Sequence, residues 1–110
     1  MHRRTKATDI PQAVKEKVWE RDNHRCVVCG SPYAFPNAHI LSRAKSGRGI
    51  ETNIVTLCGY MGNDCHRRYD NGTKEEHEMI DSIITRYMKG IYGDDWSKEA
   101  QRYSKAITPT

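Results

Sequence analysis

Residues 53–66 read NIVTLCGYMGNDCH and decide the fold that we predict for this chain of 110 residues. The run Ile54–Leu57 is apolar and rich in β-branched residues, which is typical of a short strand, and Cys58 follows it directly. Asn63 or Asp64 is the candidate N-cap of a short helix that carries His66. This helix ends at Asn71-Gly72, because asparagine and glycine are common where helices terminate. The stretch therefore predicts a strand and a helix joined by a loop, with one cysteine on each side of the loop.

Cys26 and Cys29 complete a set of four cysteines. The two residues between them allow both sulfurs to reach one tetrahedral ion. Six residues separate Cys58 from Cys65, and two of the six are glycines, so this spacer can loop out and still return Cys65 to the site. The pattern predicts a closed structural zinc site on all four thiolates, since a catalytic zinc keeps one position open. The alternatives are two disulfides, four free thiols or a redox Cys-x-x-Cys motif.

The N-terminus and the composition favour zinc over disulfides. Residues 1–6 are basic but lack the apolar segment of a secretory signal, which predicts a cytosolic protein whose cysteines stay reduced. Only 36% of residues are hydrophobic and the mean hydropathy is −0.85, so we expect a small core that a metal would reinforce. No apolar run approaches the roughly 20 residues that span a bilayer, and we expect no membrane partner.

The net charge of +4 is unevenly distributed. Residues 1–48 hold ten Lys and Arg against four Asp and Glu, whereas residues 49–110 hold eight against ten. A basic half of this kind suits a polyanion such as nucleic acid. The alternative is a solvated basic face that only aids solubility.

The chain divides into three parts, which are a basic, disordered arm over residues 1–8, a core over 9–73 and a helical extension over 74–110. Three segments come first in the core. They are an amphipathic helix near 11–22, a short strand at 38–41 and a polar, basic loop at 42–49. The strand of the opening stretch and its short helix follow this loop. The core is therefore expected to mix a few short strands with helices.

The extension carries the longest predicted helix. Thr73 and Glu76 have the spacing of a capping box, and apolar residues then recur at intervals of three and four up to Ile91. Gly93 ends this helix, and a last short helix follows over residues 96–105. Such an apolar stripe is typical of a helix that faces the core, and the alternative is an interface with a partner.

Taken in order, these motifs resemble the HNH endonucleases that carry a four-cysteine zinc site. The motifs are Cys26-x-x-Cys29, Ala38-His39-Ile40, Asn53–Cys58 and Cys65-His66. The resemblance implies an α+β fold, a small ββα-metal (His-Me finger) module with a structural zinc site, flanked by an N-terminal helix and C-terminal helices. It also implies a metal-dependent endonuclease that hydrolyses DNA phosphodiester bonds by nicking or double-strand cutting.

The resemblance implies a role for each catalytic residue. His39 would be the general base, since a neutral imidazole can accept a proton from the attacking water near pH 7. Asn53 would hold the loop and orient His39 through hydrogen bonds to the backbone. His66 and Asp70, four residues apart on one helix face, would bind a catalytic divalent cation such as Mg²⁺, Mn²⁺, Ni²⁺ or Zn²⁺. Each residue also has an alternative role when taken alone. His39 could be a core histidine and Asn53 a turn residue. His66 could be a spare zinc ligand and Asp70 a partner for Arg67.

DNA is the partner that the resemblance implies. We expect phosphate contacts from the basic residues that follow His39 and flank His66, which are Arg43, Lys45, Arg48, Arg67 and Arg68. No segment resembles a dedicated base-reading helix, so we expect low sequence specificity, and we expect no small-molecule cofactor. Small stand-alone members of the family are common in phage and prophage genomes, which implies phage packaging proteins as further partners and the cytoplasm of a bacterial host as the location.

Two departures from the family pattern bear on these expectations. The residue before the base is commonly Asp or His and supplies a metal ligand, whereas Ala38 cannot. The spacer over residues 59–64 is longer than usual, and we expect it on the surface near DNA. Ala38 favours a rival interpretation, a non-catalytic DNA-binding module that zinc stabilises. A third interpretation is an accessory protein whose long C-terminal helix docks onto a larger partner such as a phage packaging enzyme.

Overall fold

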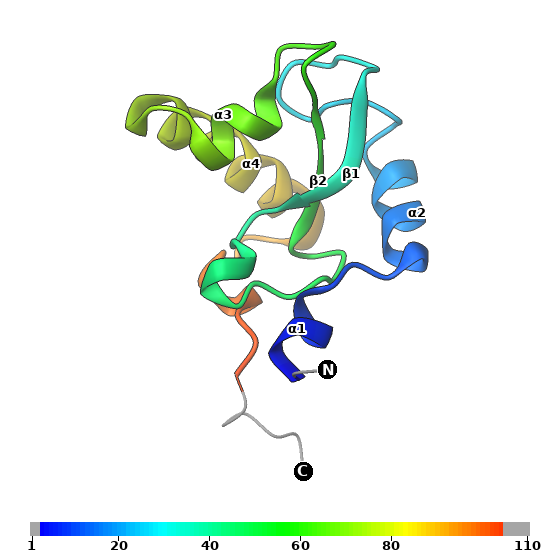
Figure 1. Cartoon of the computed structure of the whole chain (residues 1–110), viewed down its shortest axis with the longest axis vertical. Helices are drawn as coiled ribbons and strands as arrows, with labels where there is room; N and C mark the ends of the chain where they lie inside the picture. Colours follow the sequence, from blue (N-terminus) through cyan, green and yellow to red (C-terminus); the bar gives the residue numbers. More distant parts are fainter. Residues whose placement is uncertain (1–2, 105–110) are drawn as a thin grey trace.

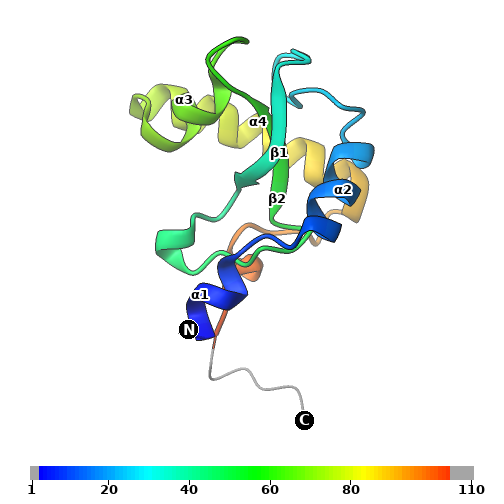
Figure 2. The same cartoon turned by 45° about the vertical axis from the view of Figure 1, so that its right-hand side comes forward.

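The computed structural model describes residues 3–104 and has a small α+β fold (Figure 1). Its sheet has two antiparallel strands, β1 (Ala34–His39) and β2 (Ile54–Cys58). Its helical elements are α1 (Arg3–Thr8), α2 (Gln12–Arg21), α3 (Cys65–Asn71), α4 (Lys74–Tyr92) and the 3-10 turns η1 (Arg43–Lys45) and η2 (Glu99–Gln101). In both views α2 lies beside the strands and α4 runs behind them (Figures 1 and 2). None of the described helices is both long and apolar enough to cross a membrane.

The sheet is irregular in the middle of β1. His39 pairs with Ile54 at one end of the ladder, but the register shifts between Phe35 and Ala38. Pro36 lies in this interval and has no amide hydrogen to donate to the ladder, so it is well suited to a bulge. Beyond the bulge, pairing resumes and places His39 at the last position of β1.

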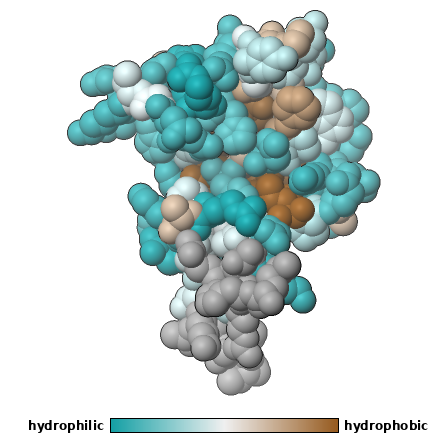
Figure 3. Space-filling view, in the orientation of Figure 1, coloured by the Kyte–Doolittle hydropathy of each residue, from teal (hydrophilic) through white to brown (hydrophobic). Residues whose placement is uncertain are grey.

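The core lies between the sheet and α4. Every residue of β2 is buried, which explains why its sequence is almost continuously apolar instead of alternating. Ile80, Ile84 and Met88 are fully buried at intervals of four along α4 and belong to the same core cluster as Val55. The apolar stripe of the long helix is therefore largely core, although Ile83 is 37% exposed. The face drawn in Figure 3 is mostly hydrophilic, with small hydrophobic areas.

The start of α4 has the predicted capping box. The Thr73 hydroxyl accepts a hydrogen bond from the Glu76 amide, and the Glu76 carboxylate accepts one from the Thr73 amide. At the other end, Gly93 has a positive φ of 101° and follows the last helical residue, Tyr92. Both ends of the longest helix are therefore fixed by residues that the sequence identifies.

The N-terminal segment is more ordered than its sequence predicts. We expected a disordered arm over residues 1–8, but Arg3–Thr8 form helix α1. The Gly49 amide donates to the Ala7 carbonyl at 2.9 Å, and Thr8 is buried. Contacts with a distant loop hold this segment, and the polar sequence of the segment itself gives no sign of them.

Other boundaries also differ from the prediction. The strand predicted at 38–41 spans Ala34–His39, because pairing with β2 continues on both sides of the bulge. The helix predicted over 96–105 is reduced to the 3-10 turn Glu99–Gln101 within the part that is described.

Candidate active site and metal centre

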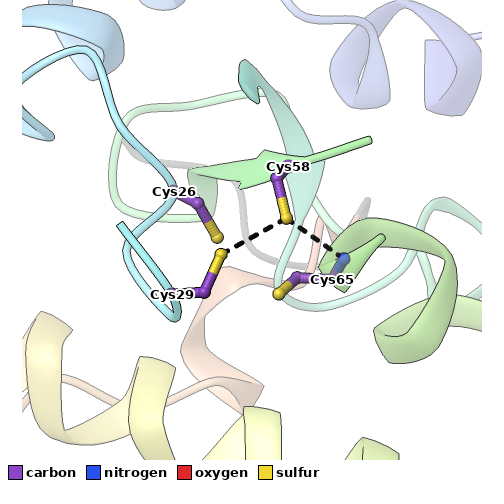
Figure 4. A group of neighbouring side chains, drawn as sticks. All are labelled: Cys26, Cys29, Cys58 and Cys65. Atoms are coloured by element: carbon purple, nitrogen blue, oxygen red, sulfur yellow. Dashed lines mark hydrogen bonds between the residues drawn. The ribbon is translucent and has the colours of Figure 1, made fainter. Parts of the chain in front are cut away.

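The four cysteines meet at one end of the sheet (Figure 4). Cys26 and Cys29 precede β1, Cys58 ends β2 and Cys65 begins α3. Their sulfur atoms all lie within 4.8 Å of one another, and those of Cys29 and Cys58 are 3.5 Å apart. Four sulfurs at about 2.3 Å from one tetrahedral zinc would be separated by about 3.8 Å. The cluster is therefore compatible with a structural zinc site, and all four thiols are free of disulfides.

The long spacer closes over this cluster. The amides of Asn63 and Cys65 lie 3.3 and 3.4 Å from the sulfur of Cys58, and N–H donors stabilise negative charge on a thiolate. A Cβ at Gly62 would lie 2.8 Å from the Cβ of Cys58, so the spacer can approach the cluster only with glycine there. The spacer is on the surface, as expected, and its Tyr60 is 86% exposed.

A cleft of about 650 Å³ opens beside the end of β1. Its lining includes His39 from β1 together with His66 and Asp70 from α3. These residues are far apart in the sequence, and the strand, the loop and the helix bring them to one place. We call this space the His39 cleft.

The ring of His39 has a fixed orientation. Its Nε2 atom lies 2.8 Å from the carbonyl oxygen of Thr8, and because a carbonyl only accepts, Nε2 must carry the hydrogen. In the neutral ring, the lone pair therefore lies on Nδ1. Burial lowers the pKa of His39 below 6.5, and the nearby Arg43 cation contributes to the same shift. His39 is therefore neutral near pH 7 and able to accept a proton at Nδ1.

Asn53 is fully buried and supports the loop that leaves β1. Its Oδ1 accepts from the Leu41 amide at 2.8 Å, and its Nδ2 donates to the carbonyls of Leu41 and Arg48 at 3.1 and 2.9 Å. A Cβ at Gly47 would lie only 1.7 Å from the Leu41 oxygen and 2.9 Å from Asn53 Nδ2. The loop can therefore fold onto Asn53 only with glycine at position 47. Asn53 acts on the loop after His39 and does not line the cleft.

His66 and Asp70 form a pair on one face of α3. Their Nε2 and Oδ2 atoms are 3.1 Å apart, and both side chains are partly exposed to the cleft. Two neighbouring ligands at about 2.1 Å from an octahedral ion are separated by about 3 Å, so this pair fits part of a divalent-cation site. Ala38 is fully buried in the core and has no polar side-chain atom. It therefore adds no ligand to the pair.

The predicted DNA-contacting residues lie in two places. Arg43 and Lys45 line the His39 cleft. Arg48 instead donates to the carbonyl of Ala100 at 3.0 Å. Arg67 and Arg68 pair with the carboxylates of Asp64 and Glu76 at 2.6 and 2.8 Å, and neither lines the cleft. The basic contribution of the predicted set to the cleft therefore comes from the loop after His39.

Three further residues of the cleft were missed by the sequence reasoning, namely Lys15 of α2, His77 of α4 and Lys98. His77 packs in a stack on the ring of Tyr69, and nothing in its local sequence indicates this contact. Lys15 and Lys98 belong to segments that no local motif connects with His39. Only the packing of α2 and of the C-terminal segment around α3 brings them there.

Comparison of the chain with protein-family models, with curated proteins and with solved structures returned no match.

Proposed function

We propose that this chain is a metal-dependent HNH endonuclease that hydrolyses DNA phosphodiester bonds in the His39 cleft. In this proposal β1, β2 and α3 form the ββα-metal module, and the flanking helices support it. The observation that carries the proposal is the convergence of His39, His66 and Asp70 in one cleft with basic side chains. A general base, ligands for a divalent cation and positive charge near the phosphate all promote phosphodiester hydrolysis.

The chemistry assigns one task to each residue. Nδ1 of His39 accepts the proton of the water that attacks phosphorus, while Nε2 stays bonded to the Thr8 carbonyl. His66 and Asp70 hold a divalent cation. When bound, such a cation stabilises the charge that develops on the phosphate and on the leaving oxygen. Asn53 keeps the loop after His39 in position through its bonds to Leu41 and Arg48.

The cysteine cluster holds zinc in this proposal and takes no part in the reaction. Cys58 ends β2 and Cys65 begins α3, so one ion fixes the angle between the strand and the helix. Cys65 directly precedes His66. A zinc ion held by the four cysteines would fix the start of the helix that carries His66 and Asp70, and it would not contact the substrate.

The charges of the cleft support a polyanionic substrate. Among its lining residues, Lys15, Arg43, Lys45 and Lys98 carry positive charge, and Asp70 is the only acidic one. Phosphate contacts of this kind position DNA without reading its sequence. We therefore propose low sequence specificity. From the resemblance to HNH endonucleases, we also propose that the reaction takes place in the cytoplasm of a bacterial host, with phage packaging proteins as partners.

Digestion of supercoiled plasmid with Mg²⁺, Mn²⁺ or Ni²⁺ tests the proposal. The wild type should nick or cut the plasmid, and His39→Ala should reduce the rate about 10²-fold or more, the range of a general base. His24→Ala is the matched control, since His24 is exposed and pairs with Glu20. Equal cleavage by the wild type and His39→Ala would contradict the proposal.

A second candidate is a zinc-stabilised module that binds DNA without cutting it, alone or as an accessory to a packaging enzyme. The buried Ala38 favours this candidate, because the cation would have only two protein ligands. Gel shifts over a salt series combined with the plasmid assay separate the two. Salt-sensitive binding without cleavage under any of the three metals would favour the binding module.

A further inference from the structure

One wall of the His39 cleft comes from α4 and the segment after it. This wall has no role in the proposed reaction. Two of its residues, His77 and Lys98, line the cleft. Neither belongs to the strand–loop–strand–helix unit that carries His39 and His66. A third residue, Tyr69 of α3, also lines the cleft.

Tyr69 is the platform on which the other two side chains rest. The ring of His77 stacks on it with centroids 4.6 Å apart and planes 7° from parallel. The ammonium of Lys98 lies 5.5 Å from the centroid of the same ring, a separation typical of a cation–π contact. Tyr69 itself is buried, and its hydroxyl lies 3.0 Å from the Ile40 carbonyl. The platform therefore lies against the chain immediately after His39.

Hydrogen bonds fix both side chains without using all of their nitrogen donors. His77 Nδ1 lies 2.7 Å from the Tyr69 carbonyl and so donates to it. Nε2 therefore carries a lone pair in the neutral ring, and it donates to a phosphate when the ring is the imidazolium. Lys98 Nζ lies 2.9 Å from Asp81 Oδ1. An ammonium has three hydrogens, so one bond to Asp81 does not exhaust it.

Asp81 holds Lys98 from outside the cleft. Its carboxylate also accepts from the Tyr69 hydroxyl at 2.5 Å. Burial alone would raise the pKa of Asp81, but the bonds from Tyr69 and Lys98 outweigh it and lower that pKa. Asp81 is therefore ionised and keeps the ammonium in place, yet it is not among the residues that line the cleft.

We propose that Lys98, together with the imidazolium form of His77, is a phosphate subsite for DNA, which binds a backbone phosphate of the substrate strand beside the one that is cleaved. The inference rests on the proposed function for the identity of the polyanion. Both side chains are preorganised on Tyr69, so little conformational entropy is lost when a phosphate binds. The C-terminal extension thereby contributes directly to substrate binding, in addition to its packing against the core.

Fluorescence anisotropy with a labelled DNA duplex tests the subsite. All variants carry His39→Ala, so that DNA stays uncut. Lys98→Gln should weaken binding about threefold to tenfold at low salt and reduce the slope of log K against log salt by about 0.9, the value of one phosphate contact. His77→Phe keeps the stack on Tyr69 but removes both ring nitrogens, and it should also weaken binding.

Two controls separate phosphate binding from structural support. Lys89→Gln makes the same charge change on α4, at a residue that does not line the His39 cleft, and should leave the salt slope unchanged. Asp81→Asn loosens the hold on Lys98 but retains its charge, so it should leave the salt slope at the wild-type value even if affinity changes. If the pair mattered only for stability, Lys98→Gln and Asp81→Asn would change the salt slope alike, and this outcome would overturn the subsite.

The subsite and the nuclease can fail separately. Equal effects of Lys98→Gln and Lys89→Gln on a protein that cuts plasmid would remove the subsite and leave the nuclease. A specific loss in Lys98→Gln on a protein that never cuts would keep the subsite and favour the non-catalytic binding module. A wild type that binds no duplex would overturn the subsite.

Discussion

His39 Nε2 donates a hydrogen bond to the carbonyl oxygen of Thr8 at 2.8 Å. These two residues are 31 positions apart, and Thr8 is the last residue of α1. The N-terminal helix therefore sets the tautomer and the orientation of the candidate base. This bond links a segment outside the ββα unit to the reaction that we propose.

Deletion of residues 1–8 should lower the rate of plasmid cleavage at saturating DNA by about tenfold or more, part of the 10² to 10⁴ that a general base contributes. The reason is that His39 loses the acceptor that holds its Nε2 hydrogen. Deletion of residues 1–5 is the control, because it removes basic residues but keeps the Thr8 carbonyl. If both deletions reduced the rate equally, lost charge and not lost orientation would explain the effect.

The pH profile of cleavage should reflect the lowered pKa of His39. Burial and the Arg43 charge favour the neutral ring, and the base is active when neutral. Activity should therefore rise with pH through a midpoint below 6.5 and then level off. The measurement is kcat/KM against pH, which reports the pKa of the free enzyme.

Arg43→Gln should shift this midpoint upward, since it removes a positive charge that lowers the pKa of His39. Arg86→Gln is a suitable control, because Arg86 lies on α4 and does not line the cleft. An acid limb that stayed at the same pH in Arg43→Gln, or a limb centred well above 6.5 in the wild type, would argue against His39 as the titrating base.

Elements whose character is fixed by local sequence were predicted well. β2 is a short apolar, β-branched run, and α4 has a capping box, an apolar period and a terminal Gly93. The clustering of the four cysteines was also predicted, since their spacing already restricts how the chain can fold around one ion. For β2 and α4 the signal lies within the element that it predicts, whereas the distant cysteine pairs are connected by the shared chemistry of one zinc ion.

Features that depend on contacts between distant segments were not predicted. α1 is a short polar helix whose order comes from Gly49 and His39, about 30 to 40 positions away. Lys15 and Lys98 reach the cleft only through the packing of α2 and the C-terminal segment. The positive charge of Lys15 and Lys98 does not indicate that these two residues share a cleft with His39.

Asn53→Asp should destabilise the protein by about 2 to 4 kcal/mol, the scale of a buried polar group left unsatisfied or opposed. The carboxylate keeps the acceptor for the Leu41 amide but faces the carbonyls of Leu41 and Arg48, to which Asn53 now donates. Urea unfolding of zinc-loaded protein measures the change. Asn71→Asp on the exposed end of α3 should change stability by only about 0.5 kcal/mol, and an equal loss in both variants would contradict the role of Asn53.

Removal of zinc should abolish cleavage by unfolding the site. Structural zinc contributes on the order of 10 kcal/mol or more of binding free energy, which equals or exceeds the roughly 5 to 15 kcal/mol by which proteins are usually stable. Treatment with a chelator should therefore remove both the helical circular dichroism signal and the activity. Excess Mg²⁺ should restore neither, whereas Zn²⁺ together with Mg²⁺ should restore both.

Cys58→Ser tests the same point without a chelator. Cys58 is buried, and its sulfur accepts from two backbone amides in addition to its place in the cluster. The variant should bind less than about half an equivalent of zinc and lose activity, since a neutral serine hydroxyl is a poor replacement for a thiolate ligand. Cleavage at the wild-type rate by this variant, with metal content measured on the same sample, would show that the cluster does not hold the catalytic helix in place.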